Sequence, residues 1–147
     1  MTSSSDEHDV EEDAVAEVPL EIVERLRPLC LALPEAYEEE AWVGARWRVR
    51  KHTFAHVVRI EAGYPPAYAR AAGTDGPVTV LTFRAAGPEL DALALAGHPY
   101  VKPGWFPDIV GLLLDDDTDW SEVAELVVES YCVLAPRKLA DRVARPR

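Results

Sequence analysis

Three arginines at alternating positions are the residues of this chain best suited to bind an anion. Arg46, Arg48 and Arg50 are separated by apolar residues, and Lys51 follows directly. In a β-strand this spacing puts the three guanidinium groups on one face, at steps of about 7 Å. A guanidinium is a planar fork of donors that matches the oxygens of phosphate and carboxylate. The pattern therefore indicates a surface for a nucleic acid or another polyanion.

The same residues also have a purely structural interpretation, which the sequence leaves open. Glu35, Glu38, Glu39 and Glu40 lie just upstream, and their carboxylates could neutralise the arginines within the fold. The solvent face of a strand is also commonly polar without binding any ligand. Both interpretations predict a strand with one wet face, and they differ in where the anionic partner comes from.

A second group of candidate residues is aromatic. A groove lined by rings suits a small ligand or a protein partner and, beside arginine, a stacked base. We expect Trp105 to be partly exposed because it lies in a Pro-Gly turn, whereas alternation with arginine directs Trp47 into the core. The candidate groove consists of Trp42, Tyr100, Trp105 and Phe106.

No local motif predicts catalysis or a bound cofactor. The sequence has no P-loop, no G-x-G-x-x-G fingerprint and no G-x-S-x-G elbow. Cys30 and Cys132 lack the spacing of zinc or redox pairs, and the carboxylate run at 115–119 lacks the pattern of an EF-hand loop. His52 and His56, four residues apart in a predicted strand, lie about 13 Å apart along it. We therefore expect no enzymatic activity, no cofactor and no metal ion.

The net charge of −11 is concentrated at the N-terminus. Residues 1–17 hold seven acidic side chains and no lysine or arginine, and they contain few apolar residues to bury. Such a segment cannot offset the entropy of ordering, which predicts a disordered acidic tail. The remainder, residues 18–147, is long enough to form one domain with its own core.

Hydropathy and cysteine content indicate the cellular location of the protein. No window approaches the ~20 apolar residues of a membrane span, and the start of the chain lacks the basic and apolar segments of a secretory signal. Two isolated cysteines are typical of reduced thiols rather than of a disulfide framework. We expect a cytoplasmic protein without membrane contact, present as a monomer or weak dimer. Its expected partner is a nucleic acid, another polyanion or a protein.

Periodicity predicts helices that flank a group of strands. In the first helix Pro28 predicts a kink or break. Asp119 is expected to cap a long helix, with Glu122 completing a capping box. The expected order is a helix at 19–33, strands at 45–50, 53–60 and 78–84, a helix at 88–96, strands at 98–101 and 109–114, and helices at 119–134 and from 136 onward.

Two segments are expected to be irregular, namely the acidic connector at 35–44 and the Gly- and Pro-rich loop at 61–77. Half-buried strands with helices at both ends of the chain fit one sheet whose dry face is covered by helices. The predicted fold is therefore α+β, a two-layer sandwich. It has one mainly antiparallel sheet of about five strands, with helices packed on one face.

Several sequence blocks resemble those of the MmcQ/YjbR family. They are Leu31-Ala-Leu-Pro-Glu with the glutamates that follow, Ala45-Arg-Trp-Arg-Val-Arg with Thr53-Phe-Ala, Thr118-Asp-Trp-Ser-Glu, and Ala135-Pro-Arg-Lys-Leu. The resemblance spans roughly residues 20–141 and leaves the acidic tail outside. It implies a CyaY-like α+β sandwich, and the family's DNA-binding-like label implies a nucleic-acid partner by analogy of fold.

The resemblance adds basic residues to the candidate surface. Lys102 belongs to the turn Lys102-Pro-Gly-Trp, through which the resemblance also runs. Arg137 and Lys138 start a predicted helix, where the helix dipole disfavours positive charge, so function explains them better than stability does. A weak nucleic-acid-binding module is the leading hypothesis. The alternative is a protein-interaction or small-ligand module that uses the aromatic groove.

Overall fold

The computed structural model describes residues 16–143 of the chain. The acidic tail predicted over residues 1–17 therefore lies, except for its last two residues, outside the described part. The elements are α2 (Leu20–Leu31), β1 (Tyr37–Glu40), β2 (Ala45–Val49), β3 (His52–Ile60), α3 (Pro66–Ala72), β4 (Val78–Arg84), α4 (Gly87–Leu95), β5 (Tyr100–Val101), β6 (Ile109–Leu114), α5 (Trp120–Leu134) and α6 (Arg137–Ala140).

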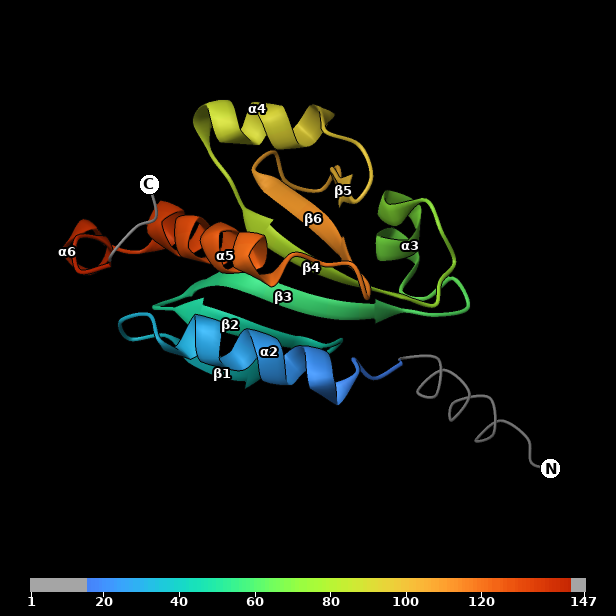
Figure 1. The fold of residues 1–147 in the computed structure, drawn as a ribbon, viewed down its shortest axis with the longest axis horizontal. Helices are drawn as coiled ribbons and strands as arrows, with labels where there is room; N and C mark the ends of the chain where they lie inside the picture. Colours follow the sequence, from blue (N-terminus) through green and yellow to red (C-terminus); the bar gives the residue numbers. More distant parts are fainter. Residues whose placement is uncertain (1–15, 144–147) are drawn as a thin grey trace.

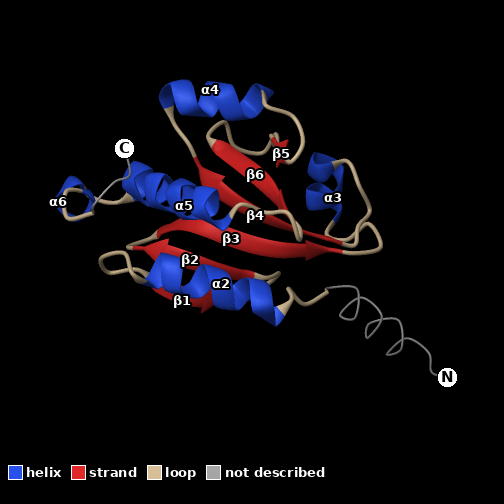
Figure 2. Cartoon of the chain, viewed as in Figure 1, coloured by secondary structure: helices blue, strands red, loops and turns tan. Residues whose placement is uncertain are grey.

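Within the described residues, six strands form an antiparallel sheet in the order β1-β2-β3-β4-β6-β5. The two long helices, α2 and α5, lie side by side over one face of this sheet (Figure 1). Figure 2 shows the strands as one curved layer with helices packed on it. The predicted α+β sandwich is confirmed, and the sheet has six strands where about five were expected.

The main core lies between the sheet and these two helices. Trp47, Val49 and Leu81 point into it from the strands and are shielded completely from solvent. Leu26 of α2 and Tyr131 of α5 meet them from the helices and are equally buried. Because side chains alternate along a strand, the residues between these strand positions face the opposite side of the sheet.

An extra residue in β3 interrupts this alternation. The register of β3 against β2 shifts at Phe54, which has no partner on β2. This β-bulge lets Phe54 and its neighbour Ala55 both join the main core, where both are fully buried. As a consequence Thr53 and His56, which are three residues apart, lie on the same face, opposite α2 and α5.

Ser130 of α5 provides hydrogen bonds for backbone groups beside the bulge. Its buried hydroxyl donates to the Phe54 carbonyl oxygen at 2.6 Å and accepts from the backbone N–H of Arg84 at 2.8 Å. One side chain therefore links β3, β4 and α5. A buried backbone group without a partner is costly, which explains a polar residue within an otherwise apolar stripe of α5.

The connector predicted at 35–44 contains an edge strand, β1. Its Glu38 accepts two hydrogen bonds from Arg27 of α2, at 2.8 and 3.0 Å, and one from the indole nitrogen of Trp47 at 3.0 Å. The Arg27 hydrogen bonds hold the pKa of Glu38 below its usual range. Contacts with partners distant in sequence therefore stabilise a strand that glutamate's low β-propensity disfavours.

The loop predicted at 61–77 contains a short helix, α3. The helix has Pro66 in its first turn and ends at Gly73, whose φ of +71° is left-handed, the usual asymmetry of helix ends. It packs on the sheet face opposite α2 and α5, so helices are not confined to one face. The buried cluster beneath it consists of Val58, Ile60, Ala69 and Val80.

The two long helices begin as the sequence predicts. Asp119 caps α5, because its side chain accepts from the backbone N–H groups of Ser121 at 3.0 Å and Glu122 at 3.3 Å. Helix α2 runs through Pro28 as one element, so the proline does not break it.

No helix within residues 16–143 has the length and apolar character needed to cross a membrane.

Replacing Ser130 by alanine should destabilise the fold strongly. The change leaves the Phe54 carbonyl and the Arg84 N–H buried without a partner, at a cost of about 1–3 kcal/mol for each group. We expect the free energy of unfolding to fall by at least about 2 kcal/mol, measured by urea unfolding. Ser121→Ala, on the exposed side of α5, should change it by less than about 0.5 kcal/mol. Equal effects of the two substitutions would contradict the role given to Ser130.

Candidate functional site

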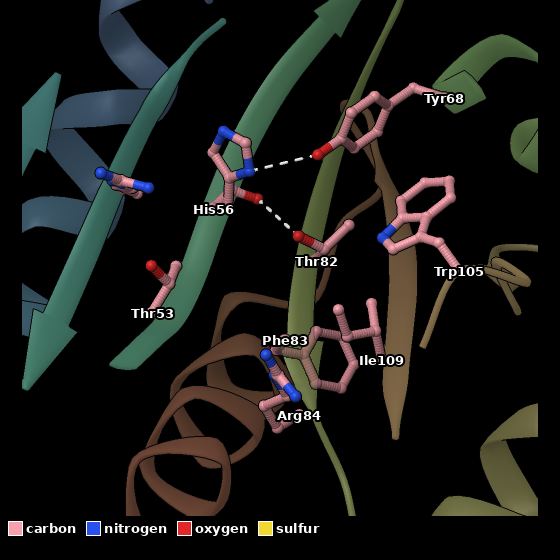
Figure 3. Close-up of a pocket in the computed structure, with 9 residues that line it drawn as sticks. Thr53, His56, Tyr68, Thr82, Phe83, Arg84, Trp105 and Ile109 are labelled. Atoms are coloured by element: carbon pink, nitrogen blue, oxygen red, sulfur yellow. Dashed lines mark hydrogen bonds between the residues drawn. The ribbon is translucent and has the colours of Figure 1, made fainter. Parts of the chain in front are cut away.

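The sheet face opposite α2 and α5 carries a half-open pocket of about 130 Å³ (Figure 3). Strands β2, β3, β4 and β6 form its floor, and α3 and the loop between β5 and β6 form a wall. The pocket is small and shallow, so it accommodates one flat group rather than a large ligand. Its lining residues are Arg46, Thr53, His56, Tyr68, Thr82, Phe83, Arg84, Trp105 and Ile109.

Cross-strand pairing brings the polar residues of the floor together. Arg46 of β2 lies opposite His56 of β3, which in turn lies opposite Thr82 of β4. Two positions farther along β4, Arg84 lies opposite Ile109 of β6. Directly opposed side chains have Cβ atoms about 5 Å apart. The floor is therefore a row of polar groups with an arginine at each end, Arg46 on β2 and Arg84 on β4.

His56 is held in one tautomer by two hydrogen bonds. Its Nε2 lies 2.7 Å from the carbonyl oxygen of Val43, which only accepts, so Nε2 carries the proton. Nδ1 then accepts from the Tyr68 hydroxyl at 3.2 Å (Figure 3). Burial lowers the pKa of His56, and the nearby charge of Arg46 lowers it further, against the effect of the Val43 bond. The imidazole is therefore neutral at pH 7.

A row of aromatic rings forms the wall of the pocket. The ring of Tyr68 meets that of His56 edge-on, with centroids 6.0 Å apart, and that of Trp105 at 5.0 Å. The Trp105 side chain remains 38% exposed. Beside this row, the guanidinium carbon of Arg84 lies 5.3 Å from the ring centroid of Phe106, a cation–π contact. Flat apolar surface and positive charge thus adjoin in one place.

Two carboxylates outside the lining hold the arginines. Glu39 contacts Nε and Nη2 of Arg46 at 2.6 and 2.5 Å, and Nη1 of Arg48 at 3.3 Å. Asp108 accepts from Nη1 of Arg84 at 2.8 Å. The hydrogen bond from Arg46 holds the pKa of Glu39 below its usual range. A guanidinium has five N–H donors, so Arg46 and Arg84 keep donors that these carboxylates do not take.

The structure divides the predicted arginine surface in two. Arg46 and Arg48 lie on the face that carries the pocket, where Glu39 contacts both. Arg50 pairs instead with Glu35, with its Nε at 2.8 Å. Its φ of 55° belongs to the hairpin turn, which takes it out of the strand's alternation. Lys51 is exposed in the same turn.

The remaining predicted basic residues do not line the pocket. Lys102 donates to two backbone carbonyl oxygens of its own loop, at 2.8 and 2.9 Å. These bonds fix the loop that carries Trp105, so Lys102 positions the wall from outside. Arg137 and Lys138 are exposed on α6 and belong to neither the floor nor the wall.

The four aromatic residues predicted to form a groove are dispersed. Trp105 lines the pocket and Phe106 lies next to it in the same loop. Trp42 follows β1 in the turn to β2 and is 82% exposed. Tyr100 of β5 packs against the main core, and its hydroxyl donates to Glu122 in the first turn of α5. Of the four, only Trp105 lines the pocket, and Phe106 lies beside it.

Most of the pocket was not singled out from the sequence. Tyr68 lies on α3, inside the segment expected to be a loop. Thr82 and Arg84 alternate with the apolar residues Leu81 and Phe83 in the sequence of β4, a pattern that indicates a polar face without indicating a site. The missing information was the pairing of β4 with β3, which brings these residues next to His56 and Arg46.

Neither a metal cluster among the described residues nor the thiol of Cys30 provides a reactive centre. Within residues 16–143, no group of three His, Cys, Asp or Glu side chains is arranged to hold a metal ion. Burial raises the pKa of the Cys30 thiol, so its reactive thiolate is suppressed. The arrangement of rings and guanidinium groups is instead suited to holding a flat, negatively charged ligand.

Protonation of His56 should destabilise the folded protein. Because burial lowers its folded pKa, the unfolded chain binds the proton more tightly. The free energy of unfolding should therefore fall as pH drops below the unfolded value of about 6.5, by at most about 1.4 kcal/mol per pH unit. Urea unfolding of the natural chain and of His56→Gln between about pH 7.5 and 5 measures this loss of stability.

The stability difference between the natural chain and His56→Gln should shrink as the pH falls. His52→Gln, an exposed substitution at the start of the same strand, serves as the matched control for removing a histidine from β3. A difference between the natural chain and His56→Gln that stays constant across this range would show that His56 is not protected from protonation in the folded state.

Comparisons with known proteins place this fold within a family. No curated protein matches the chain. The crystal structure of Deinococcus radiodurans protein DR2400, described by the domain DUF419, is similar, with 18% identity and a TM-score of 0.57 over 84% of this chain and 88% of that one. At this identity the likeness supports the fold alone. The family model for YjbR matches residues 31–133, most of the chain, and the protein therefore belongs to the YjbR family.

Proposed function

We propose that the protein binds nucleotide units of a nucleic acid, weakly, on the face of the sheet opposite α2 and α5. The observation that carries this proposal is the row of rings formed by His56, Tyr68 and Trp105, which stands beside Arg46 and Arg84 in one pocket. A nucleotide joins a flat ring to a phosphate, so a site for it needs both kinds of side chain.

Trp105 is the side chain best suited to receive a base. It is 38% exposed, Tyr68 supports its ring from one side, and Lys102 fixes the backbone of its loop. Stacking of a base on an aromatic side chain contributes about 1–3 kcal/mol and tolerates any base. The proposed binding is therefore largely independent of nucleotide sequence.

Arg46, Arg48 and Arg84 supply the positive charge. Two carboxylates, Glu39 and Asp108, accompany these three arginines, so these five side chains keep one net positive charge although the whole chain carries −11. The ion pairs orient the guanidinium groups in advance, and the donors of Arg46 and Arg84 that the carboxylates do not take are available to phosphate oxygens in the pocket. The acidic remainder of the chain repels a polyanion, which is why we expect the binding to be weak.

The architecture favours single-stranded over double-stranded nucleic acid. RRM domains expose one face of a sheet and stack two or three bases on its aromatic residues. The parallel is one of architecture and so supports the proposal by analogy only. It agrees with the DNA-binding-like label implied by the family resemblance and with the expected cytoplasmic location. The alternative aromatic groove is less favoured, because Trp42 and Tyr100 lie outside the pocket.

Binding of the full chain to a fluorescently labelled single-stranded oligonucleotide, followed by anisotropy across a salt series, tests this proposal. If the three arginines each neutralise one phosphate, the slope of log K against log salt should be about −2. Calorimetry with thymidine monophosphate in parallel distinguishes a free nucleotide from a nucleic acid as the ligand. Trp105→Ala should weaken binding by about 1–3 kcal/mol.

Trp42→Ala is the matched control, because it removes an exposed tryptophan that does not line the pocket. It should leave affinity unchanged. Absence of binding to both the oligonucleotide and the mononucleotide at low salt would overturn the proposal. An equal loss from the two tryptophan substitutions would assign binding to a different surface.

A further inference from the structure

We propose that the bound strand continues past Trp105 into a second groove, where Arg70 holds the next phosphate. This inference rests on the proposed function and specifies its ligand as a single strand of at least two nucleotides. The second groove, of about 470 Å³, lies between α3 and the loop that carries Trp105. Trp105 lines both this groove and the first pocket.

Helix α3 distributes three consecutive residues over three different surroundings. Ala69 packs into the small cluster under the helix, which anchors it to the sheet. Tyr68 reaches the first pocket, where it bonds to His56. Arg70 instead shares the outer side of the helix with Ala67 and Ala71, at the three- and four-residue spacing of one helix face. The same short helix therefore helps to form both binding surfaces.

Arg70 differs from the arginines of the first pocket in its charge environment. Glu39 and Asp108 accompany Arg46 and Arg84, whereas Arg70 is exposed and has no carboxylate partner among residues 16–143. An anion at Arg70 therefore displaces no carboxylate of residues 16–143. A phosphate would gain a charge-assisted hydrogen bond there without competing against an internal ion pair.

The position of Trp105 determines which form of nucleic acid fits. Because Trp105 lines both grooves, a nucleotide in the first pocket and its neighbour against Arg70 both reach this residue. A duplex keeps its base faces inside the stack and cannot offer them to the indole. The two grooves together therefore select single strands and gain affinity when a second nucleotide is added.

The test compares thymidine monophosphate with oligothymidylates of two, four and eight units, each titrated into the full chain by calorimetry at fixed salt. We expect affinity to rise about 5- to 150-fold between one and two units, the fold-change that corresponds to one further stacked base. Arg70→Ala should reduce that rise and make the salt slope of the oligomers shallower by about 0.7, with mononucleotide affinity unchanged.

Arg142→Ala is the control, because it removes an exposed arginine that lines neither groove, and it should leave the gain with length intact. If the mononucleotide binds but two units bind no more tightly, or if Arg70→Ala leaves the gain intact, the second groove is overturned and the proposed function stands. If none of the ligands binds, the proposed function fails and this inference fails with it.

Discussion

The extra residue in β3 at Phe54 is the constraint on which both faces of the sheet depend. Alternation along a strand would otherwise put Thr53 and His56 on opposite faces. The bulge places both on the face that carries the pocket and adds the aromatic ring of Phe54 to the main core. Ser130 makes this irregularity tolerable by bonding backbone groups of β3 and β4. Core packing and the floor of the site thus have one common cause.

Charge pairing has a similar double role at the edge of the sheet. Strand β1 presents glutamates to both sides. Glu38 bonds to Arg27 and the Trp47 indole on the side of the helices, and Glu39 contacts Arg46 on the side of the pocket. These pairs fasten β1 to its neighbours and orient an arginine of the proposed site. An acidic chain can in this way carry a locally basic surface, because its carboxylates are used to position that surface.

The sequence was sufficient for the parts of this protein that depend on local pattern. The Arg46–Arg48 alternation, the Asp119 cap and the apolar stripe of α5 follow from periodicity and capping rules, and so does the α+β class. Strand β1 and helix α3 were missed because glutamate disfavours strands and because a Gly- and Pro-rich segment is typical of loops. The site was mostly missed because His56, Tyr68 and Arg84 meet only through strand pairing and packing between distant segments.

We infer that the sheet face opposite α2 and α5, rather than the hairpin turn, binds the ligand. Nitrogen-edited NMR spectra of the isotope-labelled full chain, titrated with an oligothymidylate, test this claim residue by residue. We predict shifts of the Trp105 indole N–H and of the backbone amides of Thr53, His56 and Arg70, with the Trp42 indole unmoved. Shifts confined to the hairpin turn at Arg50 and Lys51, or to α6, with the Trp105 signal unchanged would contradict it.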